Sequence, residues 1–146
     1  MIYRPQFFKL YELVCPDVYN KFGDMAWQFF DDRTLVVIDW MRRTLNKPVT
    51  INNWHDEGEF TQRGLRCSIC QLVRDAALAN RVYVSPHMLG KAFDFDVEGM
   101  DADDVRLWIA VNKANLPYPI RLEKDVNWVH LDTEDTGVKV GFFTQS

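Results

Sequence analysis

Two histidines and an aspartate are spaced so that they can share one metal ion. Over Ala92–Val97 apolar and acidic residues alternate, so Asp94 projects from the sheet face opposite to its phenylalanine neighbours. His130 lies between two apolar residues and projects to the polar side in the same way, and His87 precedes Asp94 by a short loop. Two imidazoles and one carboxylate supply three zinc ligands and leave the fourth position to water, which is the arrangement of a catalytic zinc site.

The residues around this set form two motifs. The first is Ser85-x-His87-x-x-Gly90-x-Ala92-x-Asp94, and Trp128-x-His130 follows downstream. Together they resemble the D-alanyl-D-alanine zinc metallopeptidases, which include VanY-type carboxypeptidases and phage endolysin peptidases and share their fold with the hedgehog domain. The first motif matches the family signature at every fixed position, and the resemblance spans residues 48–143. It implies that the two histidines and the aspartate bind Zn²⁺.

Three of the fixed residues have a predicted physical role. Ser85 is expected to cap the turn before the strand or to hydrogen-bond a ligand. Gly90 is expected to allow a tight approach between the loop and the metal-bearing strand, because glycine has no Cβ atom. Ala92 keeps the strand thin beside the site.

The resemblance also implies that zinc activates a water molecule and that a nearby base takes its proton. Many family members carry the base three residues before the second histidine, where this chain has Asn127, and others carry a histidine where it has Trp128. This chain therefore departs from the family at the residue that does chemistry. Glu123 is the preferred substitute. Asp132, which has the same strand parity as His130, is the second candidate, and its other interpretation is a partner of that histidine.

The choice of Glu123 depends on how the last strands pair. With a turn at Lys124–Asn127, Glu123 lies opposite Trp128. Arg121 then lies opposite His130, and all four side chains share a face with the metal. If neither acid reaches the water, the domain binds zinc without hydrolysing anything.

Substrate binding is predicted for the loop after residues 48–54. Family members hold the substrate with an arginine that often stands in a Gly-x-Arg pattern, and Gly64-Leu65-Arg66 has this pattern. A guanidinium binds a carboxylate through two hydrogen bonds, which suits a peptide stem or a C-terminus. Arg66 is therefore grouped with Glu123 and Asp132 among the predicted catalytic residues. The alternative is an exposed loop arginine.

The three cysteines, Cys15, Cys67 and Cys70, are expected to be buried reduced thiols. Their odd number argues against a disulfide framework. The Cys67-x-x-Cys70 spacing also fits a redox pair or half of a zinc site, and His55 would complete a Cys3His set, although nothing in the spacing requires it.

The elements that position these residues predict an α+β fold with a small antiparallel sheet and helices mainly on one side, as in the resembled family. No linker or repeat interrupts residues 1–146, which predicts a single zinc peptidase-like domain. The predicted helices are short ones within Phe7–Phe30, then Asp31 or Asp32 to about Asn46, Ile69–Ala79, and Asp101 or Asp103 to about Ala114. The predicted strands are Pro48–Trp54, Ala92–Val97, Pro119–Glu123, Trp128–Asp132 and Val138–Phe143.

The bulk properties restrict the partners. The net charge is -4 and the pI is about 5.3, without clustered Lys and Arg, which argues against nucleic-acid binding. No apolar run is long enough for a signal peptide or a membrane span, so synthesis in the cytoplasm and no membrane partner are expected. A monomer is expected.

The combined prediction is a zinc-dependent peptidase that hydrolyses stem or cross-link peptides of peptidoglycan, as a carboxypeptidase or an endopeptidase. By analogy it is a phage or prophage lysin that reaches the cell wall during lysis. The alternative is a catalytically inactive zinc-containing module that binds a peptide or a protein, and Asn127 is its main support.

Overall fold

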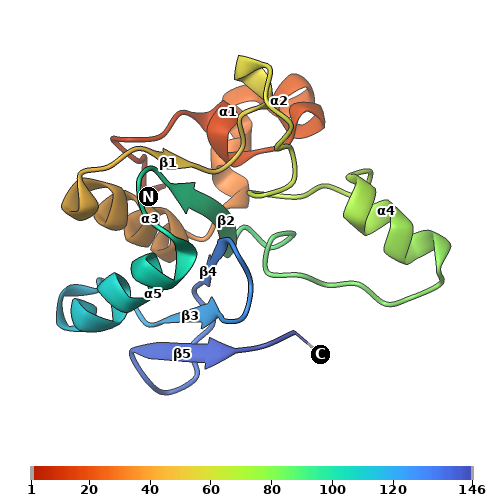
Figure 1. The fold of residues 1–146 in the computed structure, drawn as a ribbon. Coiled ribbons are helices and arrows are strands. Elements are labelled where there is room, and N and C mark those ends of the chain that lie inside the picture. The colour runs from red at the N-terminus through yellow and green to blue at the C-terminus, as the bar shows by residue number, and fades with distance from the viewer. Residues whose placement is uncertain (1, 146) are drawn as a thin grey trace.

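A computed structural model describes residues 2–145 as an α+β fold around a five-stranded sheet (Figure 1). The strand order is β1-β2-β4-β3-β5. The strands are β1 (Val49–Thr50), β2 (Ala92–Val97), β3 (Ile120–Glu123), β4 (Val129–Asp132) and β5 (Val140–Phe143). The predicted α+β class is confirmed, and β2 has the bounds expected from its alternation. The first strand is much shorter than the predicted Pro48–Trp54.

The expectation of an antiparallel sheet is wrong at one edge. β1, β2, β4 and β3 pair antiparallel in that order, but β5 pairs with β3 in parallel, with Ile120 beside Val140. The reason is connectivity. The chain reverses between β3 and β4 and again between β4 and β5, so β5 runs in the direction of β3 and occupies its free edge. The sheet is therefore mixed.

The helices begin and end near the predicted residues. Asp31 caps α3 (Asp32–Leu45) by accepting a hydrogen bond from the Arg33 amide, and Asn46 ends it in the left-handed conformation. The other helical segments are α1 (Leu10–Leu13), α2 (Pro16–Phe22), η1 (Gly23–Phe29), η2 (Trp54–Asp56), α4 (Gln71–Leu78), α5 (Ala102–Val111) and η3 (Lys113–Asn115). No helix within residues 2–145 has the length and apolarity needed to cross a bilayer.

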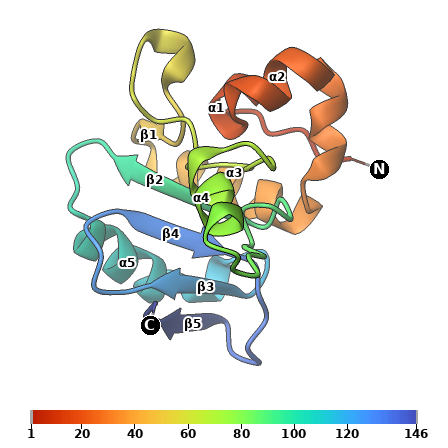
Figure 2. The ribbon, with the colours of Figure 1, turned by 90° about the vertical axis from the view of Figure 1, so that its right-hand side faces the viewer.

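The core lies between the sheet and the helices α3 and α5. Phe93 and Phe95 of β2 are fully buried, and the ring of Phe30 stacks on Phe93 at 5.8 Å between centroids. Both helices cover the same face, whereas α4 stands out on the opposite side (Figures 1 and 2). The alternation in β2 therefore sends its phenylalanines into the core and Asp94 to the face that α4 and its flanking loops overhang.

Candidate metal and catalytic site

The structure brings His87, Asp94 and His130 together. Asp94 of β2 and His130 of β4 are direct cross-strand partners, and His87 lies in the turn that precedes β2. All three residues are buried, and one ligand atom from each lies within 4.8 Å of the others. Because the sheet register itself pairs two of the three, this sheet site (His87, Asp94 and His130) could hold a metal ion without rearrangement of the backbone.

His87 is oriented by its neighbours. Its Nδ1 lies 3.0 Å from the Gly64 carbonyl oxygen, to which an Nδ1–H donates, and its Nε2 lies 3.2 Å from Asp94 Oδ2. Ser85 Oγ accepts a hydrogen bond from the His87 amide, so Ser85 caps this turn. A Cβ atom at Gly64 would lie 2.1 Å from the Leu13 carbonyl oxygen, which explains the glycine. The Nδ1 bond leaves Nε2 of His87 as the atom that could bind a metal ion.

His130 is held by carboxylates on both ring nitrogens. Its Nδ1 lies 2.8 Å from Asp94 Oδ1, and its Nε2 lies 2.8 Å from Asp132 Oδ2. Asp132 is fully buried and also accepts two hydrogen bonds from the Arg121 guanidinium, at 3.0 and 2.8 Å. Asp132 therefore orients the ring, with Nδ1 of His130 directed at Asp94.

The charges of the sheet site depend on these contacts. Burial would raise the pKa of Asp94, but hydrogen bonds with His130 and His87 outweigh it and hold the pKa well below its usual range. Burial would lower the pKa of His130, but hydrogen bonds with Asp132 and Asp94 raise it to about 9. Burial lowers the pKa of His87. An ionised carboxylate thus lies between a neutral imidazole and a protonated one.

The donor set fits a divalent cation. Two imidazole nitrogens and one carboxylate oxygen are the ligands of catalytic zinc sites, which keep a fourth position open. Each imidazole has its other nitrogen bonded to an oxygen, from Gly64 or from Asp132, as is usual for metal-bound histidines. A bound cation would replace the proton at Nδ1 of His130, because the ligand form of histidine is neutral.

Glu123 lies beside this site, although the predicted strand register is wrong by two residues. Arg121 pairs with Asp132 and Leu122 with Leu131, and this register continues with Glu123 beside His130. The parity is unchanged, so Glu123 still lies on the face of the sheet site.

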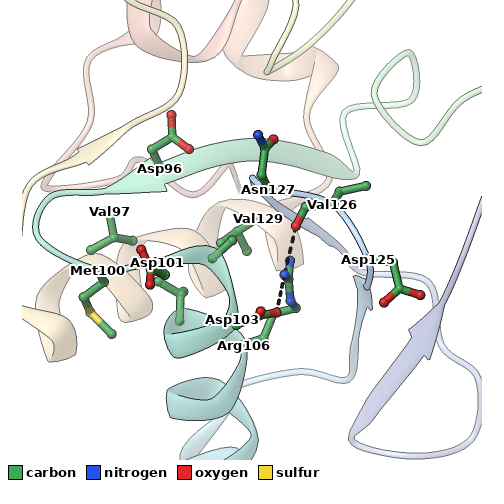
Figure 3. Close-up of a pocket in the computed structure, with 12 residues that line it drawn as sticks. Asp96, Val97, Met100, Asp101, Asp103, Arg106, Asp125, Val126, Asn127 and Val129 are labelled. Atoms are coloured by element: carbon green, nitrogen blue, oxygen red, sulfur yellow. Dashed lines mark hydrogen bonds and ion pairs between the residues drawn. The ribbon is translucent and has the colours of Figure 1, made fainter.

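The register differs because the connection between β3 and β4 is wider than the predicted turn. Arg106 of α5 donates hydrogen bonds to the carbonyl oxygens of Glu123 and Trp128, at 3.3 and 3.0 Å. It also donates to the Val126 carbonyl at 2.9 Å and forms an ion pair with Asp103 at 2.7 Å (Figure 3). This buried guanidinium holds the wider loop in place. The sequence reasoning missed Arg106, and its one signal is an arginine next to the apolar residues of the α5 core face.

Glu123 is largely buried, and its carboxylate makes no hydrogen bond or ion pair with another group within residues 2–145. Only 6% of the residue is exposed, but its carboxylate oxygens keep contact with solvent, because no fully buried side-chain oxygen among the described residues lacks a hydrogen-bond partner. Burial raises its pKa, while the charge of His130 lowers it and that of Asp94 raises it. A carboxylate that lies near the sheet site, in a largely buried residue, and makes no bond to another side chain is available to exchange a proton with a water molecule.

Arg66 is in contact with the sheet site. Its Nη2 lies 3.4 Å from Asp94 Oδ2, its Nε donates to the Gln62 carbonyl, and its Nη1 donates to the Tyr83 hydroxyl. Its side chain is 9% exposed, so it is not the exposed loop arginine of the alternative interpretation. These bonds fix the guanidinium above the ligand aspartate.

A cleft of about 500 Å³ opens at Arg66 and Asp94, between the loop at 59–66 and Trp128. A neighbouring cavity of about 600 Å³ beside α5 shares Asp96 and Asn127 with it (Figure 3), but none of the three sheet-site residues lines that cavity. Of the two cavities, only the smaller cleft is lined by a sheet-site residue, Asp94, and by Arg66. Asn127, which stands where the resembled family carries an acid, is exposed and lines both cavities.

Gly90 has a different close contact from the predicted one. Its φ is +68°, and a Cβ atom there would lie 2.2 Å from the Phe29 carbonyl oxygen and 2.6 Å from Phe30 Cα. The prediction of a close approach at Gly90 is confirmed, but the segment approached is Phe29–Phe30 and not the strand that carries Asp94. The glycine packs the motif turn against the end of η1, where Asp31 donates its amide hydrogen to the Gly90 carbonyl.

Comparison with protein families, with curated proteins and with solved structures found no match.

Proposed function

We propose that this chain is a zinc-dependent peptidase that hydrolyses stem or cross-link peptides of peptidoglycan. The observation that supports it most is the pairing of a His2Asp set with Glu123, a largely buried acid on the same sheet face whose carboxylate has no protein hydrogen-bond partner within residues 2–145. Zinc, when bound, would polarise the scissile carbonyl and make a water molecule a stronger nucleophile. The two motifs that resemble D-alanyl-D-alanine metallopeptidases support the choice of substrate.

Glu123, Asp132 and Arg66 have separate roles in proton transfer, positioning and substrate binding. Glu123 takes the proton from the attacking water and later gives it to the leaving amine, for which its raised pKa is suitable. Asp132 is a positioning residue, because its two oxygens are already engaged by His130 and Arg121. Arg66 faces the cleft beside Asp94 and binds a substrate carboxylate, as expected for a D-alanine terminus.

Digestion of purified sacculi tests this proposal. Wild-type protein loaded with zinc should release fragments whose masses show cleavage of a peptide bond, and Glu123→Gln should reduce the rate by about a hundredfold or more. Glu98→Gln is a matched control, because Glu98 is an exposed acid just past β2. Zinc content should remain equal in all three proteins. A Glu123→Gln variant as active as wild type would exclude Glu123 as the base.

A metal-containing module that binds peptides without cutting them is the second candidate. The exposed Asn127 at the position of the family acid favours it. Wild-type protein that binds zinc and muropeptides, yet cleaves no peptidoglycan type offered, would establish this candidate instead.

A further inference from the structure

The three cysteines gather in one place although they are distant in the sequence. Cys15 Sγ lies 3.6 Å from Cys67 Sγ, and Cys67 Sγ lies 3.7 Å from Cys70 Sγ, with all three sulfurs within 4.8 Å of one another. Cys15 and Cys70 are buried, and Cys67 is half-buried. The expectation of buried thiols holds for two of them, but it gave no reason for the three to meet.

The backbone is built to bring them together. Val14 and Leu65 form an isolated parallel bridge, and the Leu65 amide donates a hydrogen bond to the Leu13 carbonyl at 2.8 Å. The segment that follows Val14 therefore lies beside the segment that follows Leu65. The side chains of Asn52 and Trp54 both donate to the Val14 carbonyl, one residue before Cys15.

The Cys-x-x-Cys turn completes the arrangement. The Cys70 amide donates to the Cys67 carbonyl, and the Cys67 amide lies 3.4 Å from Cys70 Sγ. Cys70 directly precedes the first residue of α4, so the turn is continuous with that helix.

The sulfur spacing fits a metal better than a disulfide. Thiolates at the usual Zn–S distance of about 2.3 Å in a tetrahedral site lie about 3.8 Å from one another. A disulfide needs about 2.05 Å and would use only two of the three sulfurs. Iron–sulfur clusters are most often held by four cysteine thiolates, and the chain has three cysteines.

We propose that Cys15, Cys67 and Cys70 (the cysteine cluster) form a second metal site, which takes one zinc ion as a three-thiolate centre with a solvent molecule in the fourth position. His55, the fourth ligand considered from the sequence, is not part of this cluster, and its ring packs on Tyr11 at 3.9 Å between centroids. Cys67 is the half-buried member, so solvent reaches the cluster from its side.

The consequence of this site is structural. Cys67 directly follows Arg66, so an ion bound to the cluster would anchor the loop that carries Arg66 to the segment between α1 and α2. It would also anchor the start of α4, which otherwise stands out from the molecule (Figure 1). This inference does not depend on the proposed hydrolysis.

Zinc counting on the full chain tests the inference. Wild-type protein purified with a non-thiol reductant should contain two zinc ions per chain. The double variant His87→Ala/His130→Ala should retain one, and Cys67→Ser should lose one, whereas Ser68→Ala, inside the same turn, should retain both. One zinc ion in wild type that Cys67→Ser does not remove would overturn the proposal.

Spectroscopy on wild-type protein gives a test that no folding defect can obscure. Cobalt substitution should produce intense sulfur-to-metal charge-transfer absorption in addition to the weaker bands of the sheet site. The thiols should react with a disulfide reagent at least tenfold faster after chelation than before it. Cobalt-loaded protein without charge-transfer bands, or three thiols that react equally fast with and without chelator, would rule the thiolate site out. So would a metal-free Cys67–Cys70 disulfide in protein purified without reductant.

Discussion

The sheet site and the cysteine cluster are built by different means. In the sheet site, strand pairing places Asp94 beside His130, so a continuous ladder fixes the ligands before any ion binds. In the cysteine cluster, the ligands come from a helix start, a loop and a second helix start, connected by an isolated bridge at Val14 and Leu65. The strand ladder fixes the positions of the sheet-site residues, whereas the segments of the cysteine cluster would be held together mainly by the bound ion. We therefore expect the first site to control chemistry and the second to control stability.

The largest difference between the two sites should appear in hydrolysis. Asp94→Ala removes a ligand that contacts both histidines, and it should lower the rate of peptide cleavage by about a thousandfold or more, because metal activation contributes several kcal/mol. Cys67→Ala should change the rate less than tenfold, mainly through KM, since it loosens the loop that carries Arg66. Rates measured on one muropeptide under saturating zinc separate these outcomes. Equal losses in the two variants would abolish the distinction between chemistry and stability.

Stability of the sheet site should depend on a residue outside the ligand set. Arg106→Gln removes a buried guanidinium that holds three carbonyls between β3 and β4, and it should lower the free energy of unfolding by about 3 kcal/mol. Urea unfolding of the metal-free protein measures this. Arg74→Gln is the matched control, because Arg74 is exposed on α4. An equal loss in both variants would mean that Arg106 does not hold the connection.

The sequence predicted the parts of the sheet site that follow local rules. Alternation in β2 determines which way Asp94 projects, and the spacing of the first motif places His87 in the turn before it. The register of β3 on β4 could not be predicted, because the width of their connection depends on Arg106, which belongs to a different element. The error in register is two residues, so it does not change the sheet face on which Glu123 lies, and that face was predicted correctly.

The cysteine cluster could not be predicted for a similar reason. Cys15 and Cys67 are 52 residues apart, and no periodicity relates them. Their meeting depends on the close approach of Gly64 to Leu13. A glycine in the sequence does not show which segment it approaches. The short Cys67-x-x-Cys70 spacing was visible, but it is equally compatible with free thiols.

A smaller effect should separate positioning from catalysis within the sheet site. Asp132→Asn keeps the size of the side chain but weakens its bonds to His130 and Arg121, and zinc affinity should fall by about ten- to a hundredfold. Competition with a chromophoric chelator measures the affinity. With zinc saturating, the cleavage rate should fall much less than in Glu123→Gln. A rate loss as large as that of Glu123→Gln at full zinc occupancy would identify Asp132 as the base instead.

The smallest effect concerns the support of the cysteine cluster. Asn52 is buried, donates to the Val14 carbonyl and accepts a hydrogen bond from the Arg63 amide, both at 2.9 Å. Asn52→Ala should cost about 1.5 kcal/mol in the free energy of unfolding, because it leaves the amide of Arg63 without its partner. The exposed Asn115 gives the control, Asn115→Ala.

The loss of unfolding free energy in Asn52→Ala should depend on zinc. Trp54 still holds the Val14 carbonyl in Asn52→Ala, so zinc bound to the three thiolates should restore part of the lost stability. Unfolding measured with zinc and with chelator should therefore show a smaller difference between variant and wild type when zinc is present. The same comparison in a His87→Ala/His130→Ala background should give the same result, because the sheet site takes no part in it. A difference independent of zinc would mean that Asn52 supports the loop without reference to the cysteines.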